Sequence, residues 1–158
     1  MSTLGELAFG GEEGALRDRL AAGASPNDPA EFIQGFAPLF AAEQNQHLEC
    51  LRILLEAGAS LEATNPTGGT ALIMAAQKGH ADCVEALLKG GANLEAKQDG
   101  FTALLIAAQF GKADCVQALL KGGANPEATA PKGSTALLIA AQNGHADCVE
   151  ALLTGGAN

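Results

Sequence analysis

Apolar residues recur along the chain with the spacing of amphipathic helices. In the segment "TALIMAAQKGHADCVEALLKGGAN", residues 70–93, Val84, Leu87 and Leu88 stand at positions i, i+3 and i+4, on one face of a helix. An alanine-rich run of high helix propensity comes before them. Gly79 separates the two stretches and suits a tight turn. The pattern therefore predicts two short helices joined by a turn.

The residues at the ends of these helices support the same prediction. Thr70 can act as the N-cap of the first helix, because its hydroxyl can accept a hydrogen bond from an unpaired backbone N–H. In the second helix Asp82 lies near the N-terminus and Lys89 near the C-terminus, and both placements favour the helix dipole. Gly90 and Gly91 then end the helix.

The whole pattern repeats about every 33 residues. The phrase "ADCVEALLKGGAN" begins at Ala81, and close copies of it begin at Ala113 and Ala146. The cysteines of successive copies are 33, 32 and 33 residues apart: Cys50, Cys83, Cys115 and Cys148. A single helix pair cannot bury its apolar stripes, so the copies are expected to stack side by side in a solenoid. The segments between copies are rich in turn-forming residues and suit hairpin-like loops.

These copies resemble a known family, the ankyrin repeats. The family has a turn and two helices in a 33-residue unit with a T-P-L-H-x-A signature, and "TALIMAA" and two copies of "TALLIAA" are similar to it. Alanine replaces the proline of the signature, at Ala71, Ala103 and Ala136. Apolar residues replace its histidine, at Ile73, Leu105 and Leu138. The resemblance implies an all-α ankyrin-repeat solenoid of five stacked helix-turn-helix units joined by hairpin-like loops.

The expected domain organisation is a single ankyrin-repeat domain over residues 1–158. Two less regular copies precede the three clean ones, and the first has a polar face that suits an N-terminal cap. The expected units are a capping repeat at 1–25, repeats at 26–60, 61–93 and 94–125, and a last, uncapped repeat at 126–158.

Charge and composition exclude several classes of protein. Eighteen acidic and nine basic residues give a formal net charge of -9, and the basic residues form no cluster, which argues against nucleic-acid binding. The N-terminus does not resemble a secretion signal, and no apolar run is long enough to span a membrane. Repeat spacing keeps the four cysteines too far apart for disulfides, and free thiols suit a reducing compartment. The sequence predicts an intracellular protein of the cytoplasm or nucleus that does not act on membranes.

Histidine and cysteine occur together in a pattern that could indicate zinc. His47, His80 and His145 each precede a cysteine by three residues, whereas Lys112 takes the histidine position in the remaining copy. Equivalent residues of stacked repeats lie about 8–10 Å apart, but zinc needs its ligands at about 2.0–2.3 Å. We therefore expect no metal and no cofactor, and interpret the cysteines as small buried apolar residues.

The sequence contains no motif typical of an enzyme. It has no G-x-S-x-G, no P-loop and no H-E-x-x-H. Glu62, Glu95 and Glu127 recur with the repeat and are therefore spread along the solenoid, which disfavours a catalytic carboxylate pair and favours a solvated acidic edge. We expect a protein without enzymatic activity.

Positions at which the copies differ are the candidates for partner binding. In ankyrin repeats the loops and first helices line the surface that grips other proteins. The candidate residues at such positions are Phe36, Lys78, Phe101, Phe110 and Asn143, and the repeated Gln77, Gln109 and Gln142 are expected to flank them along the face. Phe101 and Phe110 are expected to lie near each other as surface anchors, although the rings could instead fold back to cover the core. The segment "DPAEFIQGF" at 28–36 is either a contact loop or a tolerated insertion.

These features predict a protein-protein interaction scaffold, and the acidic balance favours a partner with some positive charge. The last copy differs little from an internal repeat, although a terminal repeat normally needs a polar outer face. An alternative is therefore an N-terminal regulatory or targeting fragment of a longer protein, or a module that self-associates through its C-terminal repeat.

Overall fold

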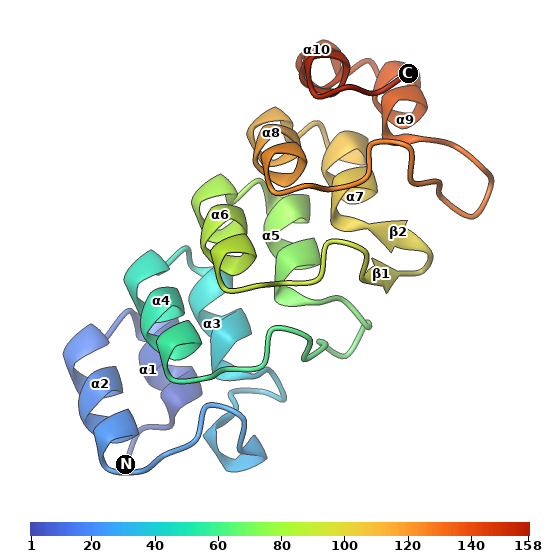
Figure 1. The fold of residues 1–158 in the computed structure, drawn as a ribbon. Helices are drawn as coiled ribbons and strands as arrows, with labels where there is room; N and C mark the ends of the chain where they lie inside the picture. The colour runs from blue at the N-terminus through green and yellow to red at the C-terminus, as the bar shows by residue number, and fades with distance from the viewer.

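The computed structural model describes residues 1–158 and shows a row of paired helices (Figure 1). The α-helices are α1 (Leu4–Gly10), α2 (Glu13–Ala21), α3 (Pro38–Gln44), α4 (Leu48–Glu56), α5 (Ala71–Lys78), α6 (Ala81–Lys89), α7 (Ala103–Gln109), α8 (Ala113–Lys121), α9 (Ala136–Gln142) and α10 (Ala146–Thr154). A short 3-10 helix, η1 (Pro29–Glu31), lies between α2 and α3. No helix has the length and apolar character that crossing a membrane requires.

The helices form two parallel rows. The odd-numbered helices, the first of each pair, stack on one another from α1 to α9, and the even-numbered helices stack from α2 to α10. The N- and C-termini lie at opposite ends of the array (Figure 1). Each pair contacts the pairs beside it, which is how short helices bury their apolar stripes in a solenoid. The predicted all-α solenoid is confirmed.

Local sequence signals determine where the helices begin and end. The side chains of Thr70, Thr102 and Thr135 each accept a hydrogen bond from the backbone N–H three residues later, so all three are N-caps. Gly79 ends α5 with φ of 88°, a left-handed conformation that favours glycine. The predicted cap at Thr70 and the predicted turn at Gly79 are confirmed.

The loops between the pairs form small hairpins on one side of the solenoid (Figure 1). Strands β1 (Lys97–Gln98) and β2 (Phe101–Thr102) pair antiparallel across the turn at Asp99 and Gly100. Three other loops each contain a single antiparallel bridge: Ile33 with Phe36, Thr64 with Thr70, and Thr129 with Thr135. The predicted hairpin-like loops are confirmed.

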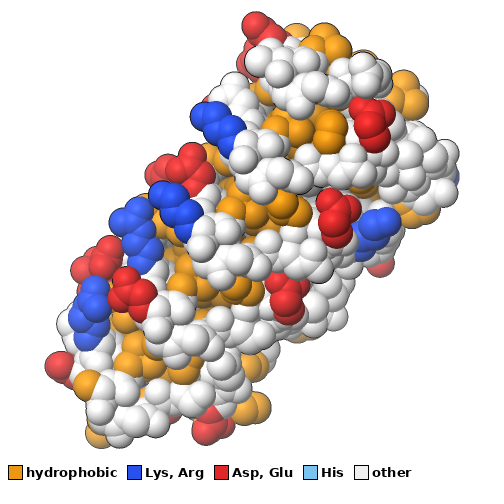
Figure 2. All heavy atoms as spheres, viewed as in Figure 1, with side chains coloured by type: hydrophobic (Ala, Val, Ile, Leu, Met, Phe, Trp, Pro, Cys, Tyr) orange, Lys and Arg blue, Asp and Glu red, His pale blue; other side chains and the backbone are white.

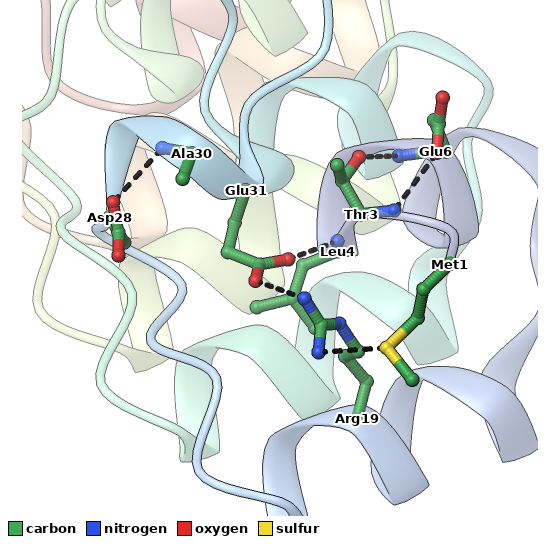
Figure 3. A network of polar contacts seen from close by, with 8 residues as sticks. All are labelled: Met1, Thr3, Leu4, Glu6, Arg19, Asp28, Ala30 and Glu31. Atoms are coloured by element: carbon green, nitrogen blue, oxygen red, sulfur yellow. Dashed lines mark hydrogen bonds and ion pairs between the residues drawn. The ribbon is translucent and has the colours of Figure 1, made fainter.

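At the N-terminal end, a buried carboxylate joins three segments of the chain (Figure 3). Glu31, at the end of η1, accepts a hydrogen bond from the backbone N–H of Leu4 at 2.8 Å and one from Nη2 of Arg19 at 2.7 Å. The other terminal nitrogen of Arg19 lies 3.3 Å from Sδ of Met1. Glu31 therefore satisfies a buried N–H at the start of α1 and pairs with a cation on α2.

The segment at 28–36 packs against α1. A Cβ atom built on Gly5 would lie 2.8 Å from the backbone nitrogen of Ile33, so the two segments approach too closely for any other residue at position 5. This segment is thus part of the packing of the N-terminal helix pair, and it does more than a tolerated insertion would.

The C-terminal end leaves apolar side chains uncovered. Leu138 on α9 is 47% exposed and Leu153 on α10 is 55% exposed, whereas Leu105, the equivalent of Leu138 on α7, is fully buried. His145 packs over Gly111, but no atom lies within 4 Å of a Cβ built on Gly144, the equivalent glycine of the last pair. The face that each repeat offers to the next is therefore open at this end.

Candidate partner-binding face

The last turns of the first helices place one repeated set of side chains on one face. Each of α3, α5, α7 and α9 has a glutamine near its end, followed by a residue that differs between repeats. We call this set the first-helix face: Gln44 and Asn45, Gln77 and Lys78, Gln109 and Phe110, Gln142 and Asn143. Residues three and four positions earlier lie on the same side of each helix: Ala41, Met74, Ile106 and Ile139.

Phe110 is the exposed aromatic residue of this face. It follows the last residue of α7 and is 45% exposed, and half-buried Ile106 lies one helical turn before it. The equivalent positions of the neighbouring repeats hold polar residues, Lys78 and Asn143. Ile106 and Phe110 together form an apolar spot among amide side chains.

Phe101 and Phe36 lie elsewhere and are half-buried. Both pack against the hydrophobic core, and the ring centroid of Phe36 is 6.3 Å from that of Phe40 in an edge-on arrangement. Phe101 precedes α7 and Phe110 follows it, so the helix separates them by about 10 Å at 1.5 Å per residue. The two candidates thus lie at opposite ends of α7, and Phe101, partly buried against the core, fits the alternative of a ring that covers the core.

Lys78 is held in an ion pair that the sequence analysis missed. Glu43 on α3 is only 1% exposed and occupies the position where α5 and α7 have Ala76 and Ala108. Its carboxylate lies 2.8 Å from Nδ1 of His80 and 3.4 Å from Nζ of Lys78, both in the next repeat. Lys78 thus compensates a buried charge within the protein.

A second exposed phenylalanine lies at the N-terminal end of the first-helix row. Nε2 of His47 lies 3.0 Å from the backbone oxygen of Phe9, just as Nε2 of His145 lies 3.0 Å from the oxygen of Gln109. Phe9 therefore takes the glutamine position in α1, and it is exposed. Sequence reasoning missed it because the first repeat is irregular and its register became clear only from this hydrogen bond.

The histidines stabilise repeat stacking. His47 and His145 bond to backbone oxygens of the preceding first helix, and His80 bonds to Glu43. No group of three His, Cys, Asp or Glu residues is arranged to hold a metal ion. Each of the three histidines thus joins its repeat to the one before it.

The cysteines are buried between the helices and carry no disulfide. Burial raises the pKa of the Cys83 thiol to about 11, with smaller contributions from the negative charges of Glu43 and Asp82. Burial also raises the pKa of Cys115 to about 11, with Asp114 as the next cause. Because the thiolate is the reactive form, these side chains are weak nucleophiles at neutral pH.

Charge is concentrated away from the first-helix face. Figure 2 shows acidic and basic side chains along the even-numbered helices and further acidic groups at the loops. The charged side chains of the first helices are Glu6, Glu43 and Lys78. Glu6 is bonded to the backbone of Thr3, and the other two pair with each other. The first helices therefore carry little net charge of their own, although Lys112 packs on Gly79 beside Lys78 and the chain as a whole is acidic.

Two of the three recurrent loop glutamates are exposed but also bonded. The carboxylate of Glu62 accepts a hydrogen bond from the backbone N–H of Asn93 at 2.9 Å, and that of Glu127 accepts one from Asn158 at 3.0 Å. Each bond joins the loop that precedes a helix pair to the segment that follows the same pair.

Comparison with known proteins agrees with this architecture. A search of the curated proteins gave no match. A family model described as ankyrin repeats in three copies matches residues 8–98 and again 91–158, which together make up nearly all of the sequence. With its stacked helix pairs, threonine caps and hairpin loops, the chain belongs to the ankyrin-repeat family.

Proposed function

We propose that this chain is a non-enzymatic scaffold that binds another protein through its first-helix face and the adjoining hairpin loops. Ankyrin repeats generally serve as protein-protein interaction modules, and proteins built from them are typically not enzymes. The buried thiols suit a reducing compartment inside the cell.

The observation that carries this proposal is the exposure of Phe110. Stacking does not require a phenylalanine at this position, because the equivalent residues Lys78 and Asn143 are polar in otherwise similar repeats. A large aromatic side chain that is 45% exposed on an otherwise polar face is typical of a residue that becomes buried in an interface.

Affinity capture with a matched pair of variants tests this proposal. Phe110→Asp should lose the partners retained by the unmodified chain, because a charge would occupy the apolar centre of the interface. Gln117→Asp is the control, since it adds the same charge on exposed α8 of the same repeat. Circular dichroism should show both variants equally folded. Equal retention of partners by both variants would place the binding site elsewhere.

A second candidate function is self-association through the open C-terminal face. The exposure of Leu138 and Leu153 favours it, because two such faces could cover each other. Sedimentation equilibrium should then show a mass above that of the monomer that rises with concentration. A variant with Leu138→Gln and Leu153→Gln should sediment as a monomer. A monomeric parent chain at all concentrations would contradict self-association.

A further inference from the structure

We propose that the first-helix face binds an uncharged, proline-rich segment of its partner in the polyproline II conformation, with three residues for each repeat. This inference rests on the proposed function and specifies the chemistry of the partner.

The first-helix face carries little net charge. Lys78, which belongs to the face, lies 3.4 Å from the buried carboxylate of Glu43, and the two charges compensate each other. Apart from Glu6 on α1, the remaining acidic groups lie on the even-numbered helices, on η1 and on the loops, and Figure 2 shows part of them. A basic partner would therefore gain little attraction from the face itself, and its attraction to exposed charges on other elements is weakened by salt screening. This inference differs from the expectation, drawn from the net charge, of a partner with some positive charge.

Four glutamines, one in each of four repeats, form a row of amide side chains that we call the ladder. Gln44, Gln77, Gln109 and Gln142 recur once in each repeat, and each offers an NH2 donor that is not used by another group of the protein. A polyproline II segment has no internal hydrogen bonds, so its backbone carbonyls are free to accept from such donors.

The spacing of the ladder along the solenoid matches the rise of polyproline II. Stacked helices lie about 8–10 Å apart. Three residues of polyproline II rise about 9.3 Å and complete one turn, so the same side of the segment faces the ladder at every repeat. A β-strand covers a similar distance in three residues, but its side chains alternate, and residue i+3 faces the opposite way from residue i. A row of identical glutamines, one for each repeat, therefore matches polyproline II better than it matches a β-strand.

The apolar spot at Ile106 and Phe110 offers a surface on which a proline ring can pack. These two side chains lie one turn apart on α7, near the middle of the ladder, and are partly or largely exposed. Aromatic surfaces beside hydrogen-bond donors are the features that proline-rich segments dock against in other domains. A proline ring of the bound segment would pack on Phe110, while the flanking carbonyls accept from Gln109 and Gln142.

NMR of the nitrogen-15-labelled chain can test this directly. The probe is an oligoproline of about 12 residues, three for each of the four rungs, titrated into the millimolar range, where weak peptide binding is detectable. The side-chain NH2 signals of the four glutamines report on the ladder, and each is assigned by its loss in the corresponding Gln→Glu variant. Comparison peptides of equal length are an uncharged Gly-Ser repeat, which lacks the preformed conformation, and a lysine-rich sequence.

We expect the oligoproline to shift the NH2 signals of Gln109 and Gln142 in a saturable way that does not change with added salt. Phe110→Ala should weaken binding about tenfold. Gln109→Glu should also weaken it, because a carboxylate cannot donate to a carbonyl, whereas Gln117→Glu on α8 should not. The Gly-Ser peptide should bind more weakly than the oligoproline.

Two results would overturn the proposal. If the lysine-rich peptide binds more tightly and is displaced by salt, the face binds a basic partner; the proposed function then stands and the inference about its chemistry fails. If no peptide shifts the glutamine signals, the polyproline II inference also fails. The capture experiment with Phe110→Asp decides separately whether the proposed function survives.

Discussion

Replacing Leu105 with alanine is expected to lower the free energy of unfolding by about 2–4 kcal/mol, while the same change at Leu138 costs less than about 1 kcal/mol. The two leucines occupy the same position in helices of identical sequence, "ALLIAAQ". Leu105 is fully buried because the next repeat covers it, whereas Leu138 is 47% exposed. Stacking alone accounts for the difference, since helix propensity and local sequence are the same.

Urea denaturation followed by circular dichroism would measure both changes, with the midpoint and the slope fitted separately because a solenoid does not always unfold in two states. Leu104→Ala and Leu137→Ala form a second pair at the neighbouring position, where one residue is buried and the other half-buried. Equal losses at Leu105 and Leu138 would mean that Leu138 is covered in solution, as self-association through this face would require.

Features that repeat along the chain could be predicted from the sequence because they depend on local interactions. A threonine cap or a glycine turn is determined by residues within four positions of it. Each recurs in several copies, and this recurrence supports its assignment. Thr70 and Gly79 are of this kind. The stacking of the helix pairs could also be predicted from the sequence, because short amphipathic helices have no other way to bury their apolar stripes.

Features that depend on contacts between repeats could not be predicted in the same way. Glu43 has an unremarkable sequence context, and its burial becomes evident only when His80 and Lys78 are placed beside it. The contact of Glu31 with Leu4 joins residues 27 positions apart. Both are exceptions to the repeat, so periodicity carries no information about them.

The candidate site was predicted in part. The sequence indicated Gln77, Gln109 and Gln142 but not Gln44, and Phe110 is exposed as expected. Phe101 also differs between copies, yet it packs against the core. Variation among repeats therefore identifies positions that stacking does not constrain, but it does not distinguish a ring directed to solvent from one folded over a loop.

The buried carboxylate of Glu43 gives the second large expected effect. Removing its partner with His80→Ala should destabilise the protein by about 2–3 kcal/mol, because the carboxylate would keep only Lys78 at 3.4 Å to compensate its charge. This destabilisation should be smaller than that caused when a buried charge loses its only partner, for which about 3–5 kcal/mol is typical. His145→Ala is the matched control, since this histidine bonds to an exposed backbone oxygen and should cost about 1 kcal/mol.

Glu43→Ala should change stability by less than about 1 kcal/mol, because the repeat architecture accommodates alanine at this position, as the buried Ala76 and Ala108 show. In the Glu43→Ala background, His80→Ala should then lose most of its effect, since no buried charge is left unpaired. Chemical denaturation of the four proteins in this double-mutant cycle gives the coupling energy. If His80→Ala is equally destabilising with and without Glu43, the histidine stabilises the repeat by packing alone, and Glu43 must be compensated by Lys78.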